Sequence, residues 1–203
     1  MFWFEDEVKR LENESEERNY QASMIFYGSS SIRLWTSLCN DFKQFSPVNL
    51  GFGGSTLAAC TWFFDRIVTP YQAKSLVFYA GDNDLGDGRH PEEIFIFFQQ
   101  LAAQVGARYG VIPCYFISIK PSLLRWGLND PLKYTNHIIE KEIADHHKNW
   151  QFIDVYNHML DEHGNPDKSY FEPDGLHLNK KGYTLWNSII YPKLSENLHA
   201  ELI

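Results

Sequence analysis

Five short, nearly all-apolar segments separated by stretches of helical length constrain the fold of this 203-residue chain most strongly. They are SMIFY after residue 22, VNLGF near 48, SLVFYA near 75, VIPCYFISI near 111 and QFIDV near 151. Strands without polar alternation fit a sheet covered on both faces, and intervening helices make such a sheet parallel. We therefore predict an α/β fold, a three-layer α/β/α sandwich around a five-stranded parallel sheet. Periodicity does not give the strand order, for which we expect the flavodoxin-like arrangement.

The segments between the predicted strands are long enough for helices. Pro91, followed by two glutamates, indicates a helix start, because proline suits the first turn and acidic side chains offset the helix dipole. The predicted helices cover residues 31–42, 56–70, 91–109, 131–148 and 180–199, after an acidic surface helix over residues 5–20. No linker or low-complexity stretch divides the chain. We predict one domain, residues 1–203, in which residues 1–21 form the N-terminal surface helix.

Composition narrows the classes of partner. The formal charge of -8 disfavours a nucleic-acid binder, which normally has a basic stripe. The acidic N-terminus lacks the features of a secretory signal, and no apolar stretch reaches the roughly 20 residues that span a bilayer. Cys39, Cys60 and Cys114 have no CxxC spacing, which is typical of buried thiols in a reducing compartment. We expect a cytoplasmic protein without a membrane span; its oligomeric state stays open.

Four blocks rich in glycine and polar residues carry the candidate chemistry. They are GSSS at 28–31, GFGGS at 51–55, GDND at 81–84 and DGLH at 174–177. The first three each follow a predicted strand, and the loops after parallel strands gather at one edge of a sheet. The blocks are therefore expected to meet at one site.

The residue types in these blocks suit acyl transfer. Ser30 lies at a strand exit and helix entry, and His177, with Asp174 three residues earlier, is a candidate base for its proton. The backbone N–H groups of Ser30 and Gly54 and the Asn83 amide are candidate donors to an oxyanion. Each block also fits a plainer role: serines cap helices, Asn83 stabilises a loop, and Gly53-Gly54 forms a turn.

The sequences GSSSIRLW, NLGFGGS, GDND and DGLHLNKKGY, in this order between residues 24 and 183, resemble the SGNH hydrolase superfamily, also called GDSL-type esterases and lipases. The resemblance implies a serine esterase with the SGNH hydrolase fold. It implies Ser30 as nucleophile, His177 as base and Asp174 as its orienting partner. Gly54 and Asn83 then complete the oxyanion hole with Ser30.

One position departs from the family's commonest first block. Ser29 stands where that block has an aspartate after the glycine, which resembles a GSSS-type subgroup. The nucleophile assignment stands, while inferences from the aspartate-containing lipases weaken.

The segment IKPSLLRW, residues 119–126, follows the fourth predicted strand and is similar to a segment of that subgroup. We expect Leu123 and Trp126 to line an acyl or leaving-group pocket. The alternative is a loop that its aromatic residue holds against the core.

The predicted reaction is hydrolysis of a small carboxylic ester through an acyl-enzyme, without metal or cofactor. The favoured substrates are short-chain or acetyl esters, including those on carbohydrates; a lysophospholipase or thioesterase is the alternative. Two rival classes stay open: a catalytically silent binding module on the same fold, and a metal-dependent hydrolase. The metal ligands would be Asp82, Asp84, His90, Asp174 and His177.

Overall fold

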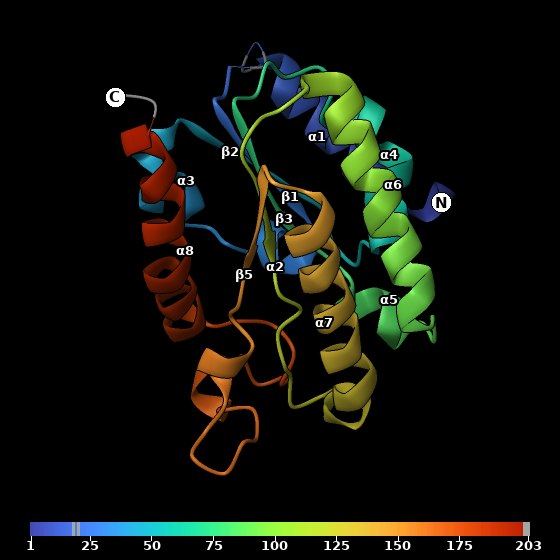
Figure 1. The fold of residues 1–203 in the computed structure, drawn as a ribbon, viewed down its shortest axis with the longest axis vertical. Coiled ribbons are helices and arrows are strands. Elements are labelled where there is room, and N and C mark those ends of the chain that lie inside the picture. Colours follow the sequence, from blue (N-terminus) through green and yellow to red (C-terminus); the bar gives the residue numbers. More distant parts are fainter. Residues whose placement is uncertain (18, 20, 201–203) are drawn as a thin grey trace.

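A computed structural model describes residues 1–17, 19 and 21–200. Five parallel strands form one sheet in the order β2-β1-β3-β4-β5 (Figure 1). They are β1 Met24–Gly28, β2 Pro47–Gly51, β3 Ser75–Tyr79, β4 Cys114–Ile117 and β5 Trp150–Ile153. This is the flavodoxin-like order, so the predicted α/β sandwich is confirmed.

Helices cover both faces of this sheet. The elements α1, α4, α6 and α7 lie on one side, and α3 and α8 lie on the other (Figure 1). The α-helices are α1 Glu5–Glu17, α2 Ser30–Arg33, α3 Leu38–Asp41, α4 Leu57–Ile67, α5 Asp82–Gly86, α6 Pro91–Tyr109, α7 Asn129–His146 and α8 Lys180–Ala200. The short 3-10 helices are η1 Phe2–Phe4, η2 Lys43–Phe45, η3 Trp126–Leu128, η4 Asn157–Met159 and η5 Lys168–Tyr170.

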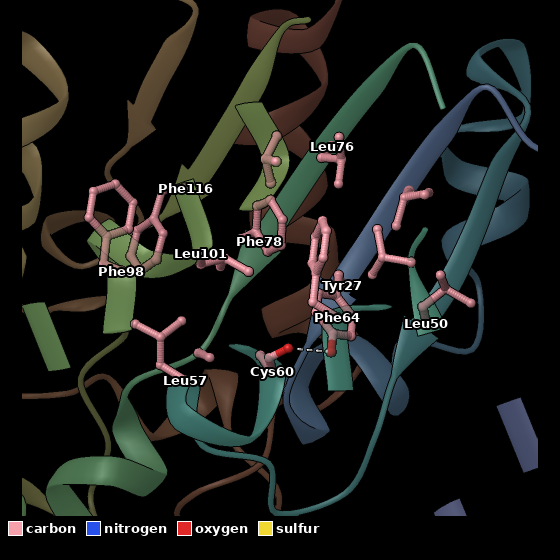
Figure 2. Close-up of a cluster of buried hydrophobic side chains, with 14 of the residues drawn as sticks. Tyr27, Leu50, Leu57, Cys60, Phe64, Leu76, Phe78, Phe98, Leu101 and Phe116 are labelled. Atoms are coloured by element: carbon pink, nitrogen blue, oxygen red, sulfur yellow. Dashed lines mark hydrogen bonds between the residues drawn. The ribbon is translucent and has the colours of Figure 1, made fainter. Parts of the chain in front are cut away.

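The all-apolar strands feed two separate cores. Along β1, Ile25 and Tyr27 pack into the core under α4 and α6, whereas Met24 and Phe26 pack into the core under α8. Successive side chains of a strand point to opposite faces, so both faces must be apolar when both are covered. In the first core the buried Tyr27 hydroxyl donates to the Cys60 carbonyl at 2.8 Å, which satisfies its polar atom (Figure 2).

Two helix predictions differ from the structure. The single helix expected over residues 31–42 is wrong: the chain forms α2 and α3 with a turn between them. The turn buries Trp35, and both its indole Nε1 and the Ser37 hydroxyl donate to Asp41 at 2.7 Å. The GDND block, expected as a loop, contains the short helix α5. In the predicted helix over 5–20, residues 18 and 20 lie outside the described residues, as do 201–203 of the predicted domain.

The cysteines are not all buried as predicted. Cys60 and Cys114 are buried, and burial raises the pKa of both thiols. Cys39 is exposed, because α3 is a single surface turn that buries Leu38 and presents the next residue to solvent. The expectation of a buried thiol at Cys39 is therefore wrong.

The register of the sheet brings the polar blocks together. Gly28, the last residue of β1, pairs with Gly51 at the end of β2 and with Tyr79 at the end of β3. Three strands thus end level, and the loops that leave them start side by side. Within the described residues no helix is long and apolar enough to cross a membrane.

Candidate active site

A sharp turn after β1 presents Ser30. Gly28 has a φ of +147°, and a Cβ at this residue would lie 1.9 Å from the Tyr79 carbonyl oxygen. Only glycine allows this close approach to β3. The Ser29 N–H donates to the same Tyr79 oxygen at 2.9 Å, and Ser30 then begins α2. The strand end therefore fixes where the serines lie.

Among the three serines, Ser30 has a histidine partner. His177 Nε2 lies 3.2 Å from Ser30 Oγ, and His177 Nδ1 lies 2.6 Å from Asp174 Oδ2. Ser29 and Ser31 are buried, whereas Ser30 is half-buried. The structure thus brings Ser30, His177 and Asp174 into one chain of hydrogen bonds, in which a carboxylate orients an imidazole toward a hydroxyl.

Asp174 also organises its own loop. Its Oδ1 accepts from the backbone N–H groups of Leu176 and His177 at 2.9 Å each. The hydrogen bond from His177, followed by these backbone bonds, lowers the pKa of Asp174 to about 2. The carboxylate is therefore ionised near neutral pH, as needed to stabilise an imidazolium.

The other candidate donors lie around the same turn. Gly54 is exposed and has a φ of +68°, and a Cβ there would meet no atom within 4 Å, so the space beside its Cα is open. The neighbouring Ser55 hydroxyl donates to the Gly28 carbonyl at 3.1 Å. Asn83, at 9 % exposure, donates from Nδ2 to the Ser55 carbonyl at 3.0 Å. The blocks that contain Ser30, Gly54 and Asn83 are thus linked by direct hydrogen bonds.

One carboxylate of the GDND block, that of Asp84, binds the start of a neighbouring helix. Asp84, fully buried, accepts from the Leu57 N–H at the start of α4 at 2.7 Å, and burial raises its pKa to about 6. His90 is the N-cap of α6. Across the part of the chain that the structure describes, no group of three or more His, Cys, Asp or Glu side chains is arranged to hold a metal ion. The Asp84 cap was not predicted, because it depends on a contact between distant segments.

The loop after β4 borders the histidine loop. The Leu124 N–H donates to the Gly175 carbonyl at 3.0 Å, and Leu123 packs against Gly175. Trp126 begins η3 and is half-buried; its place in a substrate pocket stays a prediction, as does that of Leu123. Sequence reasoning missed Arg125, whose guanidinium donates to Asn83 Oδ1 at 3.0 Å. Its position in the 119–126 segment was the available signal.

A cleft of about 610 Å³ opens beside His177. Its lining is rich in hydroxyl, amide and charged side chains, with the half-buried Tyr183 ring among them. The lining residues are Leu34, Thr36, Ser37, Asp41, Glu172, His177, Leu178, Asn179, Lys180, Tyr183, Thr184 and Asn187. Such a cleft can hold a polar group next to the hydrogen-bonded chain of Ser30, His177 and Asp174.

Solved structures share the fold at low sequence identity. A Streptococcus pneumonia protein named for platelet activating factor has a TM-score of 0.82 at 18% identity, with 95% of this chain and 94% of that chain covered. A GDSL-like lipase from Bacteroides thetaiotaomicron has a TM-score of 0.76 at 20% identity, covering 94% and 99%. A mutant of an acetyl-xylooligosaccharide esterase from Geobacillus Stearmophilus has a TM-score of 0.67 at 10% identity, covering 83% and 92%.

The comparison with curated proteins gives no match. The sequence does match a family model over residues 20–185, a region that contains all four polar blocks, and the strands and helices around them have the fold of the solved family members. This chain belongs to the GDSL-like lipase/acylhydrolase family.

Proposed function

We propose that this acylhydrolase-family protein is a serine esterase that cleaves short-chain or acetyl esters of polar alcohols, carbohydrates included, through an acyl-enzyme. The observation that carries the proposal is the continuous set of hydrogen bonds from Ser30 through His177 to Asp174. It pairs a hydroxyl with a base and the base with a carboxylate, as nucleophilic catalysis by serine requires.

The first half of the reaction forms the acyl-enzyme. His177 Nε2 takes the Ser30 hydroxyl proton while Oγ bonds to the ester carbonyl carbon, whose oxygen takes the displaced electron pair. The N–H groups of Ser30 and Gly54 and the Asn83 amide stabilise that oxyanion. Asp174 accepts the Nδ1 hydrogen bond and balances the imidazolium charge. The intermediate then collapses, the ester C–O bond breaks, and His177 protonates the leaving alcohol.

The second half repeats these roles with water. His177 takes a proton from water, the resulting hydroxide bonds to the acyl carbon, and the bond to Ser30 Oγ breaks. His177 returns the proton to Ser30, and the acid is released. No group is consumed, so the site is ready for another ester.

The cleft beside His177 favours a polar leaving group. Its polar side chains, including Thr36 and Asn187, suit an alcohol that carries several hydroxyls, and the Tyr183 ring suits the apolar face of a sugar. One structural neighbour is an acetyl-xylooligosaccharide esterase, which is in keeping with that choice. A lysophospholipid or thioester substrate is the competing class, since Leu123 and Leu124 are exposed beside the histidine loop.

The test of mechanism is covalent labelling. We expect a fluorophosphonate to label Ser30 and Ser30→Ala to abolish both labelling and turnover of an activated acetyl ester. Ser29→Ala is the matched control: its hydroxyl is fully buried, so labelling and turnover are retained. Turnover by Ser30→Ala would refute the mechanism, and failure of the folded wild type to label would favour a silent binding module.

The test of substrate class is a panel. It compares acetyl to octanoyl esters, acetylated xylose oligosaccharides and a lysophospholipid by kcat/KM. We expect acetyl esters of sugars to rank first. Preference for the octanoyl ester or the lysophospholipid would overturn the proposed class while leaving the serine mechanism in place.

A further inference from the structure

The side-chain amide of Asn83 must present its N–H face to the reaction, and the orientation of an amide is set by its partners. On one side Nδ2 donates to the Ser55 carbonyl at 3.0 Å. A second N–H on the same nitrogen is then left for an oxyanion. On the other side Oδ1 accepts from Arg125 at 3.0 Å. A guanidinium can only donate hydrogen bonds. Arg125 therefore bonds to the amide of Asn83 only when the amide oxygen, and not the amide nitrogen, faces it.

The Arg125 guanidinium is itself held in place. Its NH1 lies 3.4 Å from Asp82 Oδ2, and the buried Lys120 approaches the same carboxylate oxygen at 3.7 Å. Gly86 leaves room for it: a Cβ at Gly86 would lie 2.8 Å from Arg125 Cζ. The guanidinium therefore fits between the start and the end of α5, the helix that carries Asn83.

The loop that carries Arg125 is tied to the histidine side of the site as well. The Arg125 N–H donates to the buried Ser122 hydroxyl at 3.2 Å, and the Leu124 N–H donates to the Gly175 carbonyl at 3.0 Å. Gly175 lies between Asp174 and His177. One loop thus contacts both the amide of Asn83 and the turn of the base.

We propose that Arg125 is a positioning residue for ester hydrolysis, holding the Asn83 amide with its N–H groups toward the oxyanion. This inference rests on the proposed function. Arg125 touches no reacting atom; it acts through Asn83 by preventing the amide from turning its oxygen toward the developing negative charge. Its removal therefore slows the chemical step more than it weakens substrate binding.

The first experiment replaces Arg125. Arg125→Met keeps length without the donors, and we expect kcat to fall about tenfold to 100-fold with KM nearly unchanged, less than the 10²–10³ typical of losing an oxyanion donor itself. Arg125→Lys still only donates and should recover part of the loss. In an Asn83→Ala background, Arg125→Met should cost nothing further, because the residue it positions is absent.

A second variant moves the guanidinium without removing it. Gly86→Ala places a methyl group against Arg125 Cζ, and we expect a lower kcat in a stable protein. Gly106→Ala is the matched control: it lies within α6, where a Cβ meets no atom within 4 Å, so the variant is at least as stable as the wild type and its kcat is unchanged.

The outcomes separate the inference from the function it rests on. Wild-type kcat in both Arg125→Met and Gly86→Ala, in an enzyme that Ser30→Ala inactivates, overturns the role of Arg125 alone. If the double variant of Arg125→Met and Asn83→Ala loses kcat by the product of the two single losses, the role of Arg125 is overturned too, because Arg125 then acts independently of the Asn83 amide. Unchanged turnover in Ser30→Ala overturns the proposed function and this inference together.

Discussion

The two halves of the candidate site are built in different ways. The half with Ser30 and Asn83 sits on buried strand ends, where Gly28 abuts β3 and Asn83 is only 9 % exposed. The half with Asp174 and His177 is a surface loop, whose side chains are 47% and 31% exposed and which is ordered by hydrogen bonds within four residues. The proposed oxyanion donors are thus fixed by the core, whereas the proposed base is fixed locally. Changes that crowd the buried backbone of the first half should therefore cost more folding stability than side-chain changes in the exposed second half.

The largest expected effect is on the exposed half. Asp174→Asn keeps an oxygen for the turn but loses the charge that stabilises the imidazolium. We expect kcat for an activated acetyl ester to fall about 10³–10⁴-fold, as for the aspartate of other serine hydrolases. Urea denaturation at neutral pH should show a smaller loss in the free energy of unfolding than Gly28→Ala causes, because the Asp174 side chain is 47% exposed and its interactions are screened by solvent. A large loss of stability would contradict the division between the two halves.

The next largest effect is on the buried half. Gly28→Ala places a methyl group 1.9 Å from the Tyr79 carbonyl oxygen, and we expect the free energy of unfolding to fall by about 3 kcal/mol or more. Gly110→Ala separates clash from backbone strain, since Gly110 also has a positive φ, +67°, but open space around it. Its expected cost is that of backbone strain alone, on the order of 1–3 kcal/mol. Equal losses in the two variants would show that packing against β3 is not the cause.

The pH dependence of stability should differ in sign between the two halves. Burial raises the pKa of Asp84 from 3.8 to about 6, so its contribution to stability is complete below pH 3.8 and is lost as pH rises through 6. The loss is on the order of 2–3 kcal/mol. Asp174, with its pKa lowered to about 2, contributes above pH 3.8 and loses that contribution as pH falls through 2.

Urea denaturation from pH 4 to 7 tests the prediction for Asp84. Asp84→Asn keeps an acceptor for the Leu57 N–H without a titrating charge. The wild type should therefore lose stability relative to this variant between about pH 4 and 6. A constant difference across that range would exclude Asp84 as the titrating group.

The smallest effect concerns the loop between the halves. Trp126→Ala should change the ratio of kcat/KM for octanoyl and acetyl esters by about tenfold, the low end of what one methylene group in an apolar pocket contributes. The measurement is the ester panel with both proteins. An unchanged ratio would mean that Trp126 only holds the loop against the core.

Local patterns explain which predictions succeeded. Pro91 and Glu93 mark the start of α6 because capping is decided within one turn, and the Glu93 carboxylate does accept from the His90 N–H at 2.8 Å. The helix over 31–42 failed because Trp35 is buried by a distant partner, α8, where it packs on Tyr183 and Trp186. Burial against a remote helix outweighed local helix propensity there.

The candidate site also contains one contact that local sequence predicts and one that it does not. Asp174 and His177 are three residues apart, so their pairing follows from a tight turn that the sequence itself encodes. Arg125 and Asn83 are 42 residues apart, and nothing in either segment indicates that a guanidinium meets an amide. Only the packing of the loop after β4 against α5 brings them together.

The sequence by itself determined the alternation of strands and helices and the residue types of the four polar blocks, because apolar periodicity and turn chemistry act over a few residues. The tertiary structure decided which serine faces His177, which buried carboxylate caps α4, and which arginine holds Asn83. These contacts depend on strand register and on the approach of distant segments, where one ångström separates a hydrogen bond from none.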